Sequence, residues 1–351
     1  MKYTVALVLV AACGSHLDNS GAVDGNGGGT DGTTTQCDPT MATACSGPNV
    51  VACNADGTYG AVMQMCGAGQ VCQGGQCTNA CTADGVDLVY VVDEQNDFMS
   101  FDPRKLPNDP FVKIGTLSCP HNNTSIQTGN NVAMPFSMSV DRDGVAWVLY
   151  TTGELFNVSL TTAACTKANN TIGAGGMDLF GMGFALDAPM MDAEKLFLAG
   201  GNRDPSATPR KLAYDDTHAN NLTPVFVANI AATADVSPEL TGTAEAKLYG
   251  FFPRITQVPY IQEIGKTSGA AVGQTWNVGT TGLGAGIRDW AFAQWGGVFY
   301  VFVTTEDNNG VRNSTVRAVD RATSAYSVVK QNLPYYIDGA GVSTCAPAVL
   351  Q

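Results

Sequence analysis

The stretch PFSMSVDRDGVAWVLYTTGELFNVSLTT, residues 135–162, has the pattern of three short β-strands joined by two tight turns. Large apolar residues alternate with serines over 136–140, and a period of two is typical of a strand. Gly144 and Gly153 complete an Asp-Gly and a Thr-Gly turn, which bracket a continuous apolar run of the kind seen in buried strands. The stretch therefore predicts consecutive strands joined by hairpins.

The same pattern returns along the rest of the chain in units of about four strands. Each unit opens with a strand that carries small residues on one face, and a strongly apolar strand follows it. The opening strands are expected at 136–140, 180–184, 239–243, 290–293 and 339–343, and the apolar strands at 146–150, 195–200, 247–252, 298–303 and 87–92. Third and fourth strands, such as 260–269 and 326–330, complete the units, and no stretch predicts an amphipathic helix.

Repeats of four strands, about 45 to 60 residues apart, resemble a β-propeller. None of the repeats contains the Trp-Asp dipeptide that marks the blades of some propellers. The resemblance implies an all-β fold with a five-bladed propeller over residues 82–351. The small residues have a physical reason, because neighbouring sheets crowd together near the axis. The first blade is expected to take its inner strand from the C-terminal end of the chain and its other three strands from the N-terminal side.

Composition limits the partners of this chain of 351 residues. Only 14% of the residues are charged, and the formal net charge is −13. This balance disfavours nucleic acid and anionic membrane surfaces, because both attract Lys and Arg. Three histidines in the whole chain disfavour a His-based metal or acid–base site, and eleven cysteines without a CxxC pair predict disulfides in an oxidising compartment.

The N-terminus predicts export. Residues 1–12 contain Lys2 and a short apolar run that is too short to span a bilayer, which is typical of a signal peptide. The residues Val-Ala-Ala before Cys13 resemble the lipobox of bacterial lipoproteins. This resemblance implies cleavage before Cys13 and acylation of its thiol, as in a Gram-negative surface lipoprotein. Gly14 follows, where an Asp would resemble the inner-membrane retention signal of such lipoproteins, so the outer membrane is the expected location. The alternative is an ordinary cleaved signal peptide.

Two further segments are expected before the propeller. Residues 13–36 are rich in Gly, Ser, Thr and Asp and predict a flexible, disordered tether. Residues 37–81 resemble small disulfide-rich modules of secreted proteins, because apolar content is low and cysteines are frequent. This module is expected to be a spacer rather than a binding module, because the sequence indicates that only its turn residues are exposed. Its six cysteines allow fifteen sets of three bridges, which the sequence leaves open: Cys37, Cys45, Cys53, Cys66, Cys72 and Cys77.

The remaining cysteines predict how the propeller closes. Cys81 precedes the first apolar strand and Cys345 follows the last inner strand, where the other blades have a hairpin, so a Cys81–Cys345 disulfide is expected to replace that turn. Cys119 and Cys165 are then expected to pair across adjacent blades. A competing assignment places Cys81 in the small module and leaves Cys345 free.

Four acids lie near the starts of inner strands, namely Asp178, Glu239, Asp289 and Asp338. Glu239 and Asp289 are predicted at the same register. The propeller resemblance implies that this end opens onto the funnel where ligands bind. A ring of carboxylates there would suit Ca²⁺, a sugar or a cationic ligand, with Arg288 beside it. The structural alternative is that these acids cap backbone amides or pair with Arg288.

The sequence favours a monomeric surface protein for binding or scaffolding, with a glycan or protein ligand, no catalytic residue, and Ca²⁺ as the only candidate cofactor. The alternative is a propeller glycosidase or other hydrolase that uses the funnel carboxylates. Asp141 and Asp307 begin segments with calcium-loop spacing, but hairpin turns explain both.

Overall fold

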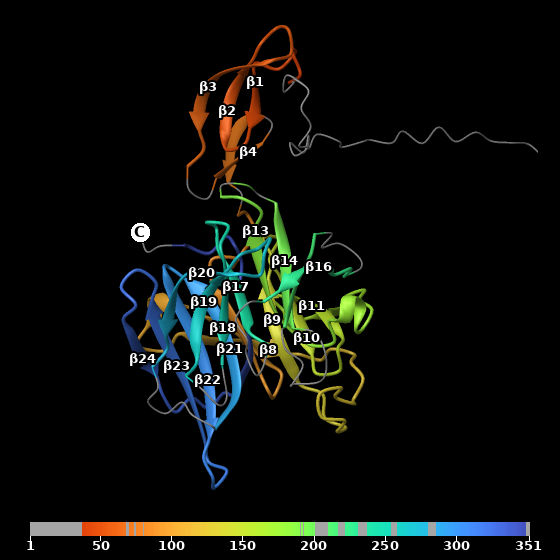
Figure 1. The fold of residues 1–351 in the computed structure, drawn as a ribbon, viewed down its shortest axis with the longest axis vertical. Coiled ribbons are helices and arrows are strands. Elements are labelled where there is room, and N and C mark those ends of the chain that lie inside the picture. Colours follow the sequence, from red (N-terminus) through yellow and green to blue (C-terminus); the bar gives the residue numbers. More distant parts are fainter. Residues whose placement is uncertain are drawn as a thin grey trace, which may run out of the picture.

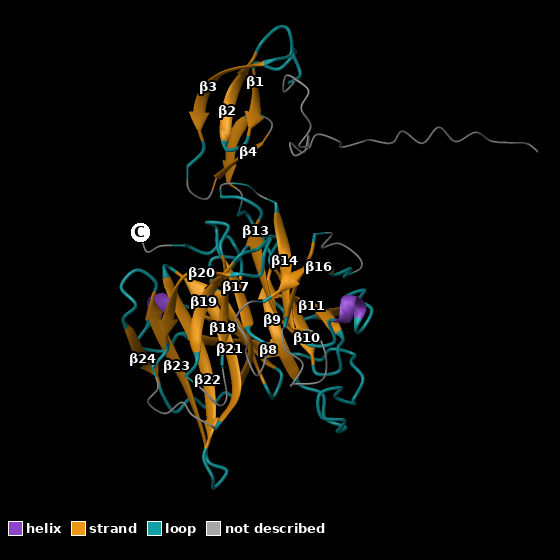
Figure 2. Ribbon diagram, viewed as in Figure 1, coloured by secondary structure: helices purple, strands orange, loops and turns teal. Residues whose placement is uncertain are grey.

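The computed structural model describes residues 37–67, 70–73, 75–79, 81–189, 191, 193–200, 210–216, 222–230, 237–253, 258–279 and 286–348. The predicted signal peptide 1–12, Cys13 and the tether 13–36 lie outside these residues. Within the described ranges the regular structure is almost entirely antiparallel β-strand, as Figure 2 shows, and the helices are two short 3₁₀ turns, η1 (Pro103–Lys105) and η2 (Ala174–Gly176). None of the helices in this part of the chain has the length and apolar character needed to cross a bilayer. The all-β prediction is confirmed.

The N-terminal residues form a small β-structure that projects from one end of the main body (Figure 1). A three-stranded sheet and a hairpin make up this part, with the strands β1 (Thr43–Ser46), β2 (Asn49–Cys53), β3 (Tyr59–Met65), β4 (Gln70–Gln73) and β5 (Gln76–Asn79). Three disulfides cross-link it, Cys37–Cys53, Cys45–Cys72 and Cys66–Cys77. Few apolar side chains are buried among its described residues, so the disulfides supply the cross-links that a larger core would otherwise provide.

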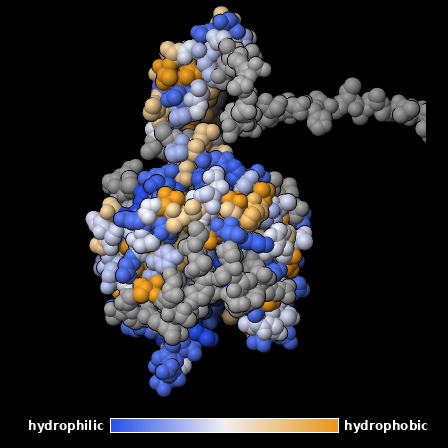
Figure 3. Space-filling model, viewed as in Figure 1, coloured by the Kyte–Doolittle hydropathy of each residue, from blue (hydrophilic) through white to orange (hydrophobic). Residues whose placement is uncertain are grey.

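The surface of β3 differs from the sequence expectation. The preference for a spacer rests on turn residues being the exposed ones, yet Val62, Met63 and Met65 of β3 are exposed by 59%, 65% and 65%. Figure 3 shows apolar surface on this N-terminal part. The premise of that preference is therefore wrong.

The described residues of the main body form five four-stranded antiparallel sheets. Four of them use consecutive strands, β9–β12, β13–β16, β17–β20 and β21–β24, while the fifth has the order β25-β6-β7-β8. We call the fifth the closing sheet and β21–β24 the last sheet. The strand bounds are β6 (Val89–Asp93), β7 (Asp97–Phe101), β8 (Phe111–Thr116), β9 (Pro135–Val140), β10 (Val145–Tyr150), β11 (Leu155–Ser159), β12 (Cys165–Lys167), β13 (Phe180–Leu186), β14 (Glu194–Gly200), β15 (Lys211–Asp215), β16 (Val225–Asn229), β17 (Glu239–Gly242), β18 (Leu248–Phe252), β19 (Tyr260–Ile264), β20 (Ala271–Asn277), β21 (Ile287–Trp295), β22 (Val298–Glu306), β23 (Arg312–Asp320), β24 (Tyr326–Lys330) and β25 (Ile337–Val342).

The first strand of each sheet contacts the first strand of the next. β25 lies against β9, β9 against β13, β13 against β17, β17 against β21, and β21 against β25 again. These five strands coincide with the five opening strands predicted from the sequence. The sequence analysis does not identify β7, β12 or β15, which lack a run of alternation as long as that of the opening strands.

Small residues sit where these strands approach one another. A Cβ atom at Gly242 of β17 would collide with the carbonyl oxygen of Phe184 and come within 2.6 Å of the Ala185 Cβ, both on β13. A Cβ atom at Gly181 of β13 would likewise collide with the carbonyl oxygen of Pro238. The backbones therefore meet directly, as the crowding argument predicts.

We expect Gly242→Ala to lower the free energy of unfolding by about 1–3 kcal/mol, because the added methyl group must push β17 away from β13. Urea denaturation followed by tryptophan fluorescence measures this change, since all four tryptophans lie in the main sheets. Ser327→Ala is the control, because it changes one exposed side chain of β24 within the main sheets. Equal stability of the two variants would contradict the close approach.

A disulfide joins the two ends of the main body. Cys81 and Cys345 form the disulfide predicted from the sequence, with an S–S distance of 2.01 Å across 264 residues of chain. Cys119 and Cys165 form the second predicted bridge at 1.98 Å. The competing assignment, with Cys81 in the small module and Cys345 free, is wrong.

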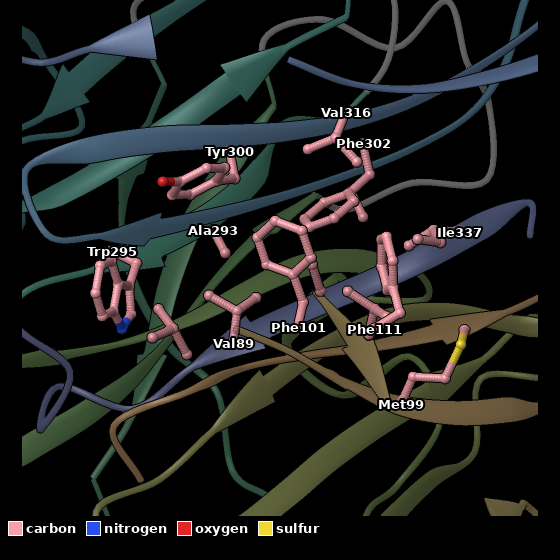
Figure 4. Packing of buried hydrophobic residues seen from close by; sticks show 14 of the residues in the cluster. Val89, Met99, Phe101, Phe111, Ala293, Trp295, Tyr300, Phe302, Val316 and Ile337 are labelled. Carbon is pink, nitrogen blue, oxygen red and sulfur yellow. The ribbon is translucent and has the colours of Figure 1, made fainter. Parts of the chain in front are cut away.

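Apolar clusters fill the spaces between neighbouring sheets. The cluster in Figure 4 lies between the last sheet and the closing sheet and centres on Phe101, Phe111 and Phe302. The ring centroids of Phe101 and Phe302 are 5.3 Å apart in an edge-to-face arrangement. The acidic residues described next lie at one end of the interface that this cluster fills.

Candidate functional site

Acidic side chains gather at the end of the last sheet and the closing sheet where β21 and β25 begin. Asp289 on β21 and Asp93 on β6 each lie two residues from a side chain of the apolar cluster between these sheets, so strand alternation directs both carboxyls toward that interface. Asp338 on β25 belongs with them, because its largest charge interactions are with Asp289 and Glu94. We call Asp93, Glu94, Asp289, Glu306 and Asp338, together with Arg288 and Arg312, the acidic cluster.

Two irregularities in strand pairing occur at this end. β21 pairs Ile287 with Thr305 and Asp289 with Thr304, which makes Arg288 an extra residue. β25 likewise has Asp338 as an extra residue opposite β6. Such bulges bend a strand and re-aim its side chains, and they are frequent beside functional sites.

The two arginines of the cluster are paired with glutamates. Arg312 Nη1 lies 2.7 Å from Glu94 Oε2, and Arg312 Nε lies 3.2 Å from Glu306 Oε2. Arg288 Nε lies 3.3 Å from the same Glu306 oxygen. The cluster therefore holds five carboxyl groups against two guanidinium groups, and the guanidinium groups contact the glutamates rather than Asp289 or Asp338.

Three oxygen atoms of this region are buried without a hydrogen-bond partner among the described residues. They are Asp289 Oδ2, Asp338 Oδ2 and Thr304 Oγ1. Thr304 lies directly across from Asp289 on β22, so both side chains are on one face of the sheet. Because buried polar atoms in folded proteins nearly always have partners, three such atoms in one place mark this interface as the candidate site.

Burial also changes the protonation of these acids. It raises the pKa of Asp289 to about 6, against the opposing effect of Arg312 and with a further rise from Glu94. It raises the pKa of Asp338 well above the usual range, with the negative charge of Asp289 adding to the effect. Burial raises the pKa of Asp93 to about 6, although two backbone amides donate to that carboxylate. Burial at this interface therefore makes all three aspartates harder to ionise than exposed ones, and Asp338 most of all.

Glu239 lies apart from the cluster. Its Oε2 atom accepts a hydrogen bond of 2.8 Å from Ser137 Oγ, which itself accepts one from the Met182 amide, so three inner strands are linked. Burial raises the pKa of Glu239 well above its usual range.

The register of β17 and β21 separates Glu239 from Asp289. The Gln294 amide donates to Thr241 Oγ1 at 3.2 Å, which sets Glu239 level with Phe292. Glu239 is then three residues, about 10 Å, from the level of Asp289. The prediction that the two acids share a register is wrong, because Asp289 lies five residues before Gln294 whereas Glu239 lies two residues before Thr241.

Asp178 is also elsewhere. It is half-buried in the loop before β13, with its carboxyl group beside Gly173. Of the four acids predicted from the sequence, the structure brings together Asp289 and Asp338. Arg288 belongs to the same cluster, because it forms an ion pair with Glu306. The sequence analysis missed Asp93 and Glu94, although they directly follow the predicted strand 87–92.

The acids with calcium-loop spacing have turn roles. Asp141 Oδ1 accepts from the Val145 amide at 2.8 Å, and Asp307 Oδ1 accepts from the amides of Asn309 and Val311 at 2.8 Å each. Across the described ranges, no group of three or more His, Cys, Asp or Glu side chains is arranged to hold a metal ion.

Comparison with known proteins assigns no family. No protein-family profile and no curated protein sequence matches the chain. Solved structures with partial similarity include an endo-arabinase from Bacteroides thetaiotaomicron, with 10% identity over 62% of this chain and 82% of that one and a TM-score of 0.39. Another is GH43B of a Bacteroides ovatus xyloglucan locus, with 12% identity, coverages of 56% and 41%, and a TM-score of 0.40. A Bacteroides thetaiotaomicron protein of unknown function has 10% identity, coverages of 72% and 58%, and a TM-score of 0.40. Similarity at this level carries no argument about activity.

Proposed function

We propose that this chain is a lipid-anchored, extracytoplasmic binding protein, built as a five-bladed β-propeller, that takes its ligand at the acidic cluster. Five disulfides support an oxidising compartment. Five four-stranded sheets whose first strands contact one another in a cycle support the propeller. The lipobox-like residues before Cys13 support the anchor.

The observation that carries the binding site is the group of unpartnered oxygens on Asp289, Asp338 and Thr304. A buried acceptor without a partner costs about 1–3 kcal/mol, and a ligand that donates hydrogen bonds recovers that cost. Because carboxyl groups outnumber guanidinium groups in the cluster, a cationic group is the ligand that charge favours, and sugar hydroxyls are the neutral alternative.

A glycan array and a panel of organic cations, applied to the purified full chain, test this proposal. We expect Asp289→Asn and Asp338→Asn each to weaken binding of any captured ligand by about tenfold or more, because each removes a charge-assisted hydrogen bond. Asp143→Asn is the matched control, since it removes one exposed carboxyl at the opposite end of β9. Unchanged binding in both cluster variants, with unchanged tryptophan fluorescence, would exclude this site.

A glycosidase is the second candidate, favoured by the same pair of aspartates. Glycoside hydrolysis uses two carboxyl groups, one of them kept protonated by a raised pKa, and Asp289 and Asp338 provide neighbouring carboxyls of this kind. The same variants serve here, with release of chromogenic leaving groups from pentosides and hexosides as the readout. No hydrolysis by the wild-type chain across that panel would remove this candidate.

A further inference from the structure

Asp289 and Asp338 reach one interface from two different sheets. Asp289 lies on β21 of the last sheet and Asp338 on β25 of the closing sheet, and these strands lie against each other. Each carboxyl has a buried Oδ2 without a hydrogen-bond partner. Two ionised carboxylates here would set like charges against each other in a region with little water to screen them.

The surrounding charges do not neutralise the pair. Arg312 on β23 is engaged by Glu94 at 2.7 Å and Glu306 at 3.2 Å, and its guanidinium group lies 5.0 Å from the Tyr336 ring centroid. Arg288 on β21 contacts Glu306 on β22. Asp93 at the end of β6 adds a further carboxylate, whose Oδ1 accepts from the amides of the β6–β7 turn.

We propose that Asp289 and Asp338 retain one proton between them at neutral pH, and that a cationic group binds to the acidic cluster in exchange for this proton. The retained proton follows from the placement of the two carboxyl groups at one interface, and the exchange rests on the proposed function. A retained proton turns one carboxyl into a donor and removes the repulsion across the interface.

The exchange balances in charge and atoms. On binding, the O–H bond of the protonated carboxyl breaks, the proton passes to solvent, and the electron pair stays on the carboxylate. The positive charge of the ligand replaces that of the proton. Affinity for a permanently charged cation therefore rises with pH, by about tenfold per pH unit at most while the pair is still protonated.

Thermal unfolding of the full chain between pH 5 and pH 8 tests the pair without any ligand. The folded-state pKa of each aspartate is raised above its unfolded value, so the stability linked to this proton is present at low pH and is lost as pH rises through the folded-state pKa. We expect Asp289→Asn or Asp338→Asn to raise the Tm at pH 8 by about 2–4 °C and to leave it nearly unchanged at pH 5.

Additivity identifies the pair as one unit. Asp289→Asn and Asp338→Asn are not expected to add, because either substitution removes the repulsion. Glu194→Gln is the matched control. Burial raises the pKa of Glu194 to about 7, and its carboxylate accepts from Thr344 Oγ1 at 2.7 Å beyond the opposite end of β25. Its effect is expected to add to that of Asp338→Asn.

Methylguanidinium is the probe for the exchange. Isothermal titration calorimetry in two buffers of different ionisation enthalpy counts the protons released, and about one per bound cation is expected. Additive effects of the two Asn variants would overturn the retained proton. Binding without proton release would overturn the exchange and leave the binding function standing. A failure of methylguanidinium to bind would overturn the exchange, and a negative ligand screen as well would overturn the proposed function.

Discussion

The double variant Cys81→Ser/Cys345→Ser is expected to lose about 5 kcal/mol of unfolding free energy in the main sheets. The disulfide joins residues that are 264 positions apart, so its removal returns a large loop-closure entropy to the unfolded chain. In the closing sheet it also links the end of β25 to the start of β6, whereas in the other sheets a hairpin connects the corresponding two strands. Urea denaturation followed by tryptophan fluorescence under non-reducing conditions measures the loss.

The small N-terminal structure provides the control for this experiment. Cys37→Ser/Cys53→Ser removes a bridge that spans 16 residues, in a part of the chain that contains no tryptophan. This variant is expected to leave the fluorescence transition unchanged. If both double variants shift the transition equally, or neither does, the disulfide at Cys81 does not secure the main sheets.

Phe302→Ala is expected to lower the free energy of unfolding by about 3–5 kcal/mol. Phe302 is fully buried between the last sheet and the closing sheet, and its ring packs edge-to-face on Phe101. The substitution leaves a cavity at the interface that holds the acidic cluster above it. Urea denaturation gives the loss of stability, and ligand binding measured below the transition shows whether the cluster has moved.

Phe226→Ala is the matched control for that substitution. Phe226 lies on β16 and is 55% exposed, so its removal creates no cavity and is expected to change stability by less than about 0.5 kcal/mol. A loss of similar size in both variants would contradict the packing between the two sheets.

Alternation made the strands predictable. The inner strands lie between two other sheets, so each must present apolar or small side chains on both faces, and this requirement is visible in segments such as 136–140 and 180–184. The disulfide between Cys81 and Cys345 was predictable for a related reason. The repeat shows that the closing sheet lacks the hairpin between its first two strands, and these two cysteines stand where that hairpin would be. Both inferences depend on a pattern that recurs along the chain.

The site was less predictable, because it depends on features that occur once. Glu239 and Asp289 both precede small residues in the sequence, but the offset between β17 and β21 places them at different levels, and the bulge at Arg288 re-aims the side chains beside Asp289. The pairing of Arg312 with Glu94 joins residues from two sheets that are far apart in the chain. Nothing in local alternation reveals a bulge or a partner from another sheet.

The order of the strands in the closing sheet has a consequence during biosynthesis. A ribosome makes β6 long before β25, so the edge of β6, with the sequence Val-Tyr-Val-Val-Asp, stays unpaired while the four other sheets are made. A nascent or prematurely terminated chain thus has an unpaired strand edge, which can hydrogen-bond to other chains until β25 pairs with it. Translation that stops short of β25 yields a product prone to aggregation, whatever the state of its remaining sheets.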